Sequence, residues 1–281
     1  MLKTLLKRLL FALFFFLLTL VTQIGGVVFV FSWFLYKYAF AQRVGLRKGR
    51  IFIKTSLFVA CYFAATAVVA LWLAPMFGRV PLPMFLDKNV TPVNVLTCVL
   101  NRNYVRPALK TAVENVAAQL ERFEDKPEIR YLDANFPFLN GFPLVPHLSH
   151  SDGRKLDVAF FYNDKNTGLR TNAKPAFSGY GVFEGPRKGE RDRISECKKQ
   201  GFWQYDKAKY MQFGANEADF VFDESHTKTM VQLFAKEKAI EKMFIEPHLQ
   251  TRLELENEPK IRLHGCKAVR HDDHLHVQIV R

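Results

Sequence analysis

The chain has 281 residues, of which 49% are hydrophobic, and a formal net charge of +13. The positive charge is concentrated at one end, because residues 1–78 carry nine Lys and Arg residues and no Asp or Glu. This distribution excludes an ordinary cytosolic enzyme and argues against a nucleic-acid partner, which would require cations on a folded binding surface.

Two uncharged segments predict membrane-spanning helices. Residues 9–36 form a run of 28, about 42 Å of helix, which is long for a single pass. The run either tilts or breaks at residues 23–26 into a hairpin of two short spans. Residues 56–77 have the length of one span. A cleaved signal peptide over residues 1–25 is the alternative interpretation of the first run.

Basic residues around these segments predict the orientation. Residues 37–54 carry six Lys or Arg and no acidic residue, so the positive-inside rule places this loop in the cytoplasm. Basic residues before the first run favour a cytoplasmic N-terminus as well. The chain must then cross the membrane twice before the basic loop, which favours three spans over two. We therefore expect residues 1–78 to be an anchor of two or three helices in cell inner membrane lipid, with the C-terminal part in the periplasm.

The rest of the chain predicts a single α+β domain. Residues 79–104 are expected to be a linker leaving the membrane, since Pro81 and Pro83 follow the second span. Residues 105–281 are expected to fold as a compact domain with a small antiparallel sheet. Hydrophobic periodicity predicts helices and strands in this domain. The helices are at residues 107–123, 227–237 and 248–255, and the strands at 129–132, 156–162, 242–245 and 274–280.

A first histidine-rich segment lies in the middle of this domain. It contains His147, His150 and Asp157, with Gly153 between the last two. A turn at the glycine would bring a loop histidine and an aspartate at the start of a strand to one point. Zinc binds imidazole and carboxylate groups, and a catalytic site uses three protein ligands and a water. The segment therefore supplies two candidate metal ligands.

The second histidine-rich segment lies near the C-terminus and contains His271, His274 and His276. Because side chains alternate along a strand, His274 and His276 point to the same face. One can bind a metal while the other stands beside the metal-bound water. His248 and His264 stand apart from both segments and are interpreted as structural or surface residues.

Together the two segments resemble a known zinc peptidase superfamily, which includes D-alanyl-D-alanine dipeptidases and the hedgehog signalling domain. The pattern is His-x-x-Gly-x-x-x-Asp followed by a late His-x-His. Residues 146–158 (PHLSHSDGRKLDV) and 271–277 (HDDHLHV) resemble most the penicillin-insensitive murein endopeptidases. The resemblance covers about residues 129–281 and is strong only at these two motifs.

The resemblance implies a role for individual residues. The catalytic Zn²⁺ would be bound by His150, Asp157 and His276. His274 would act on the water or the tetrahedral intermediate, with His271 supporting it. Some members of this family have further metal ligands, at positions that correspond to His147, Asp223 and His226 in this sequence. Leu148 stands where the family often has Arg.

The implied function is that of a membrane-anchored zinc metallopeptidase that hydrolyses peptide crosslinks in peptidoglycan, with the stem peptides as substrate. A D,D-carboxypeptidase or dipeptidase of the same superfamily is an alternative. So is a non-catalytic, zinc-stabilised module that binds murein or a partner protein.

Three cysteines, Cys98, Cys197 and Cys266, would then face an oxidising compartment. This arithmetic predicts one disulfide and one free thiol, and Cys197–Cys266 is one such pairing.

Overall fold

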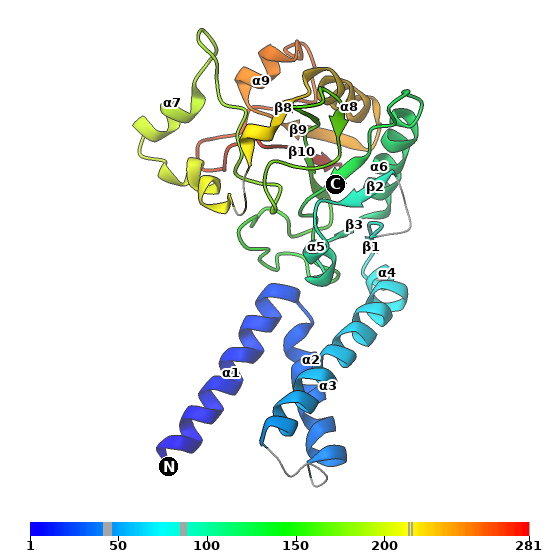
Figure 1. Ribbon diagram of the computed structural model, residues 1–281, viewed down its shortest axis with the longest axis vertical. Helices are drawn as coiled ribbons and strands as arrows, with labels where there is room; N and C mark the ends of the chain where they lie inside the picture. Colours follow the sequence, from blue (N-terminus) through cyan, green and yellow to red (C-terminus); the bar gives the residue numbers. More distant parts are fainter. Residues whose placement is uncertain (42–46, 85–88, 213, 215, 281) are drawn as a thin grey trace.

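The N-terminal end of the chain is a group of long helices, and the remainder is a mixed α+β unit built around small sheets (Figure 1). The computed structural model describes residues 1–41, 47–84, 89–212, 214 and 216–280. This architecture confirms the predicted α+β class at the coarse level.

The elements follow one another in this order. The N-terminal helices are α1 (Leu2–Thr22), α2 (Gly25–Leu35), the π-helical η1 (Tyr36–Phe40), α3 (Arg47–Val68), the π-helical η2 (Val69–Leu73) and α4 (Ala74–Met76). The later helices are α5 (Leu96–Val99), α6 (Pro107–Leu120), α7 (Arg193–Lys199), the 3₁₀ segments η3 (Trp203–Met211) and η4 (Glu217–Asp219), α8 (Glu224–Lys236) and α9 (Pro247–Arg252). The strands are β1 (Val80–Pro81), β2 (Val90–Pro92), β3 (Tyr104–Val105), β4 (Ile129–Tyr131), β5 (Lys155–Ala159), β6 (Tyr162–Asp164), β7 (Arg170–Thr171), β8 (Phe220–Phe222), β9 (Ile240–Phe244) and β10 (His274–Ile279).

The first uncharged run breaks into two helices at residues 23–24, which is the second of the two predicted alternatives. Gln23 has a φ of 65° and ends α1, and the backbone N–H of Gly25 donates to Thr22 Oγ1 at 2.8 Å. A Cβ on Gly25 would lie 2.6 Å from the same oxygen, so only glycine allows this close approach. Two helices are long and apolar enough to cross a membrane, Leu2–Thr22 and Gly49–Val68, and Gly25–Phe40 is a shorter apolar helix. Residues 42–46 of the basic loop lie outside the described residues.

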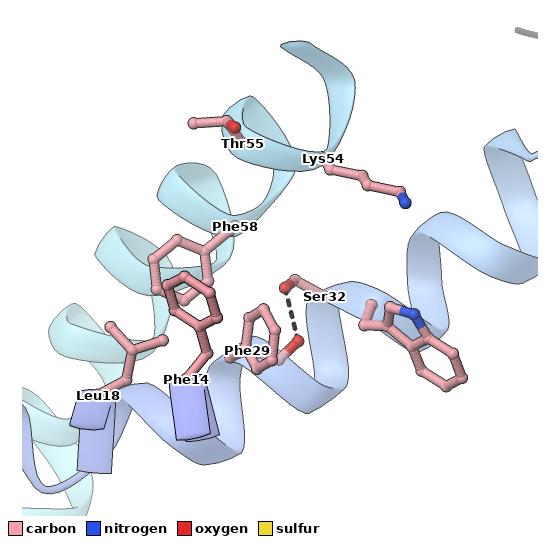
Figure 2. Close-up of a pocket in the computed structure, with 8 residues that line it drawn as sticks. Phe14, Leu18, Phe29, Ser32, Lys54, Thr55 and Phe58 are labelled. Carbon is pink, nitrogen blue, oxygen red and sulfur yellow. Dashed lines mark hydrogen bonds between the residues drawn. The ribbon is translucent and has the colours of Figure 1, made fainter. Parts of the chain in front are cut away.

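Aromatic side chains hold these three helices together. A cavity of about 280 Å³ lies among α1, α2 and α3, and Figure 2 shows Phe14, Phe29 and Phe58 gathered beside it. The rings of Phe29 and Phe58 join α2 to α3, with their centroids 6.3 Å apart. The Ser32 hydroxyl donates to the Phe29 carbonyl at 2.9 Å within its own helix (Figure 2), so the serine is satisfied in apolar surroundings.

The helices pack directly against the α+β unit. The Tyr62 hydroxyl of α3 donates to the Val99 carbonyl at 2.7 Å and accepts from Asn101 at 2.9 Å. At the α1–α2 break, Gln23 Oε1 accepts from the Phe138 backbone N–H at 2.8 Å. The N-terminal helices therefore meet the α+β unit through specific hydrogen bonds.

The interpretation of residues 79–104 as a linker is wrong for the part that the structure describes. β2 pairs in parallel with β4, β1 pairs with β3, and Val90 is buried in the main core. The prolines misled the prediction because proline is tolerated in edge strands as well as in linkers. Residues 85–88 lie outside the described residues.

The central sheet positions the candidate site. Its strand order is β2-β4-β5-β10-β9, antiparallel except for the β2–β4 pair. Alternating residues of β5 and β10, such as Val158 and Val277, enter the core shared with α6 and α8. The residues between them, including Asp157, His274 and His276, therefore lie on the opposite face.

Candidate metal centre

Three predicted ligands converge on the face of the sheet opposite α6 and α8. His276 stands directly across from Asp157 in the β10–β5 register, with His276 Nδ1 at 2.8 Å from Asp157 Oδ1. His150 Nε2 lies 3.2 Å from His276 Nδ1 and 3.3 Å from Asp157 Oδ1. Tetrahedral zinc with bonds of 2.0–2.1 Å sets its donor atoms about 3.3 Å apart. These buried side chains can therefore hold a metal ion.

His150 is oriented by its second ring nitrogen. Its Nδ1 lies 2.8 Å from the Ala134 carbonyl, which can only accept, so Nδ1 donates this hydrogen bond and Nε2 is the nitrogen that can bind a metal. The chain bends at Gly153, which has a φ of 80° and donates its N–H to Asn135 Oδ1 at 3.0 Å. The predicted turn between the loop histidine and the strand aspartate is confirmed.

Asp157 is held by Tyr180, a residue that the sequence analysis missed. The Tyr180 hydroxyl donates to Asp157 Oδ2 at 2.9 Å and accepts from the Asp133 backbone N–H at 3.1 Å. Burial alone would raise the pKa of Asp157, but His150 and His274 hold that pKa well below its usual range. The sequence feature that could have pointed to Tyr180 is the pair of glycines that flank it, both of which have a positive φ in the structure.

His147 lies beside the three-residue group. Its Nδ1 is 2.9 Å from Asp133 Oδ2 and 3.5 Å from Asp157 Oδ2. Arg102 pairs with the same Asp133 oxygen at 2.6 Å. Since Nδ1 of His147 already faces Asp133, this histidine supports the group from outside it.

His274 lies next to the group on the same strand face. Its Nδ1 contacts Asp273 Oδ1, and Asp273 Oδ2 accepts from the Gly181 N–H at 2.7 Å. The other ring nitrogen, Nε2, lies 3.5 Å from Asp157 Oδ1. Burial alone would lower the pKa of His274, but Asp157 and Asp273 outweigh it and raise the pKa to about 9. Because Nδ1 is taken by Asp273, Nε2 is the ring nitrogen that His274 presents to the site.

His271 connects this site to a second group. Its backbone N–H donates to Glu246 Oε1 at 2.9 Å, and its ring centroid lies 5.1 Å from that of His274. Burial and the neighbouring His264 hold the pKa of His271 well below its usual range. Glu246, His264 and His271 form a second group of buried donors that could hold a metal ion.

Asp223 and His226 are not brought to the site. Asp223 is the N-cap of α8, and its carboxylate accepts from the His226 backbone N–H at 3.0 Å and contacts His226 Nδ1 at 2.7 Å. The other ring nitrogen of His226 faces Asp125 at 3.4 Å. The Asp-x-x-His pattern thus begins a helix, and the structure assigns it no place in the metal group.

A cavity of about 230 Å³ opens over the three ligands. Leu148, Lys207 and Lys267 lie among its lining residues, and Leu148 is 62% exposed. The Cys197–Cys266 disulfide fixes the segment before Lys267, with an S–S distance of 1.98 Å. This bond agrees with the predicted pairing, and Cys98 is a buried free thiol.

No protein-family model matches this chain, and no curated protein matches it either. The resemblance to the murein endopeptidases therefore rests on the two sequence motifs.

Proposed function

We propose that this protein is a membrane-anchored zinc metallopeptidase that hydrolyses the peptide crosslinks of peptidoglycan. The observation that carries the proposal is the convergence of His150, Asp157 and His276, with His274 beside them. Two imidazoles and one carboxylate form the donor set of a catalytic zinc site. A zinc ion bound there would polarise the scissile carbonyl and lower the pKa of water to about 7.

The chain's own residues supply the proton transfer. Because Asp273 fixes Nδ1 of His274, the nitrogen left for chemistry is Nε2, which faces the ligand group. His274 can donate a proton to the leaving amine or stabilise the developing oxyanion. Asp157 stays ionised, and Tyr180 holds its second oxygen.

The N-terminal helices support a location for the substrate. The anchor packs directly on the domain, so the catalytic domain would work close to the membrane surface. We propose that this surface is the periplasmic face of the inner membrane, where crosslinked stem peptides are found.

The test is digestion of purified crosslinked peptidoglycan by the full chain in detergent, followed by chromatography of the products. We expect dimeric stems to become monomers without shortening, a chelator to abolish the activity, and a β-lactam to have no effect. Loss of only the terminal D-Ala would make the protein a carboxypeptidase. An unchanged profile with zinc bound would favour the non-catalytic, murein-binding alternative.

A further inference from the structure

A second set of metal-type donors lies behind the first, on the far side of His271. His264 Nε2 lies 3.3 Å from Glu246 Oε1 and 3.4 Å from His271 Nδ1. These separations match the spacing of about 3.3 Å between the donor atoms of tetrahedral zinc. Glu246 is fully buried, and the two histidines are each 7% exposed.

The Tyr205 hydroxyl adds a fourth polar atom at the same point. Its hydroxyl lies 2.7 Å from Glu246 Oε1 and 3.0 Å from His264 Nε2. The rings of Tyr205 and His264 stack, with an angle of 12° between their planes. Four polar atoms from separate segments therefore converge in a buried space.

Hydrogen bonds among these four residues cannot satisfy all of their polar atoms. The proton of the Tyr205 hydroxyl goes to the carboxylate, which only accepts. His264 Nε2 carries at most one proton, so it cannot donate to both Glu246 and His271. Glu246 Oε1 also accepts from the His271 backbone N–H, whereas Glu246 Oε2 has no hydrogen-bond partner among the described residues. Among those residues the ion-pair partner of Glu246 is His264, and no Lys or Arg side chain faces the carboxylate. A buried carboxylate with one unpaired oxygen and no permanent cation beside it is costly.

We infer that Glu246, His264 and His271 form a second zinc site, with the Tyr205 hydroxyl at its fourth position. A divalent cation neutralises Glu246 and accepts the histidine lone pairs. Two imidazoles and a carboxylate favour zinc over calcium or magnesium, which prefer oxygen ligands.

The second ion would have a positioning role. Glu246 immediately precedes α9, and His264 lies two residues before Cys266 of the disulfide. His271 stands beside His274, with the ring centroids 5.1 Å apart. Zinc at this point would tie the disulfide-held rim of the cavity to the end of β9 and fix the His271 ring next to His274.

Metal stoichiometry tests the inference without depending on hydrolysis. The full chain in detergent is stripped with a chelator, reloaded with zinc alone, dialysed and measured by elemental analysis. We expect two equivalents of zinc for the wild type, and one for each of Glu246→Gln, His264→Gln and His150→Ala. The His150→Ala/His264→Gln double variant should hold none.

The matched control is His248→Gln. His248 is also fully buried, but its Nε2 bonds to the Glu184 carbonyl at 2.8 Å, outside both groups. This variant should keep two equivalents. One equivalent in the wild type, or two in both Glu246→Gln and His264→Gln, would overturn the inference. If these variants fail to fold, anomalous scattering at the zinc edge from wild-type crystals decides: a second peak among the three donors supports the site, and its absence refutes it.

Discussion

Asp157 is the residue that joins the parts of the candidate centre. One carboxylate oxygen faces His150 and His276, and the other accepts from Tyr180. A ligand carboxylate with both oxygens engaged has one orientation, which is the preorganisation that metal affinity requires. Replacing the ligand and replacing its support should therefore have different effects.

Removing the support should weaken zinc binding without removing a ligand. In Tyr180→Phe, Asp157 Oδ2 loses its donor and the Asp133 N–H loses its acceptor. We expect the zinc dissociation constant to rise about 10–100-fold, measured by competition with a chromogenic chelator. Tyr210→Phe is the control, because Tyr210 is 73% exposed. An unchanged dissociation constant in Tyr180→Phe would show that the hydroxyl does not orient the ligand.

Replacing His274, which we propose as the proton-transfer group, should separate catalysis from metal binding. In His274→Gln, the three ligands remain but the nitrogen that faces Asp157 is lost. We expect kcat on a dimeric stem peptide to fall by about 10²–10⁴-fold, with the zinc content unchanged. His226→Gln, at the first turn of α8, should keep the wild-type kcat. Wild-type turnover in His274→Gln would remove His274 from the reaction and make His271 the better candidate.

Spacing in the sequence could predict only the local part of the ligand geometry. The glycine between His150 and Asp157 and the period of a strand predict that these two residues lie close together and that His274 and His276 share a face. That His276 stands across from Asp157 depends on the pairing of β10 with β5, so this ligand came from the family resemblance. Tyr180 comes from a loop whose path depends on tertiary contacts, and no periodicity predicts where it lies. Asp223 and His226 illustrate the opposite error, since an Asp-x-x-His pair also satisfies the first turn of a helix.

At the scale of elements, amphipathic periodicity predicted α6, and its apolar stripe is buried at Leu109, Ala112, Val113, Val116, Ala117 and Leu120. Phe123 lies beyond the end of the helix and is 40% exposed. The segment after β6 contains α7 and η3, where the sequence analysis predicted no helix. Its order comes from long-range contacts with the loop before β10, including the disulfide and the 2.7 Å ion pair between Asp206 and Arg270.

This ion pair should make stability depend on pH. Burial alone would raise the pKa of Asp206, but hydrogen bonds from Lys198, Arg270 and Lys209 outweigh it and lower the pKa to about 2. Because the folded pKa lies below the unfolded value, the stabilisation is present above about pH 4 and is lost as the pH falls towards 2.

Asp206→Asn should therefore lower Tm at pH 6 by about 2–4 °C and reduce the further loss of Tm between pH 4 and 2. Thermal unfolding of the full chain in detergent at a series of pH values measures this effect. Glu256→Gln, at an exposed position, is the control and should parallel the wild type. A parallel curve for Asp206→Asn would contradict the role given to the ion pair.

At the scale of the whole molecule, the arrangement of charge agrees with three passes through a membrane. Figure 1 shows the start of α1, the end of α2 and the start of α3 at the end of the helical group that points away from the domain. Lys3, Lys7 and Arg8 lie at this end, as do Lys37 and Lys54. From the positive-inside rule we therefore predict that this end lies in the cytoplasm and the domain on the other side of the membrane.

Phosphatase fusions test this topology, because the enzyme is active only in the periplasm. We expect activity for fusions after residues 23 and 281 and none for a fusion after residue 45, which lies outside the described residues. The segment of α2 and η1 spans only 16 residues, about 24 Å, against about 30 Å of hydrocarbon. If this short helix does not cross, the fusions after residues 23 and 45 will report the same side. An inactive fusion after residue 281 would place the domain in the cytoplasm. Because crosslinked murein is absent from the cytoplasm, this result would contradict the proposed function, whereas the two candidate metal sites do not depend on the topology.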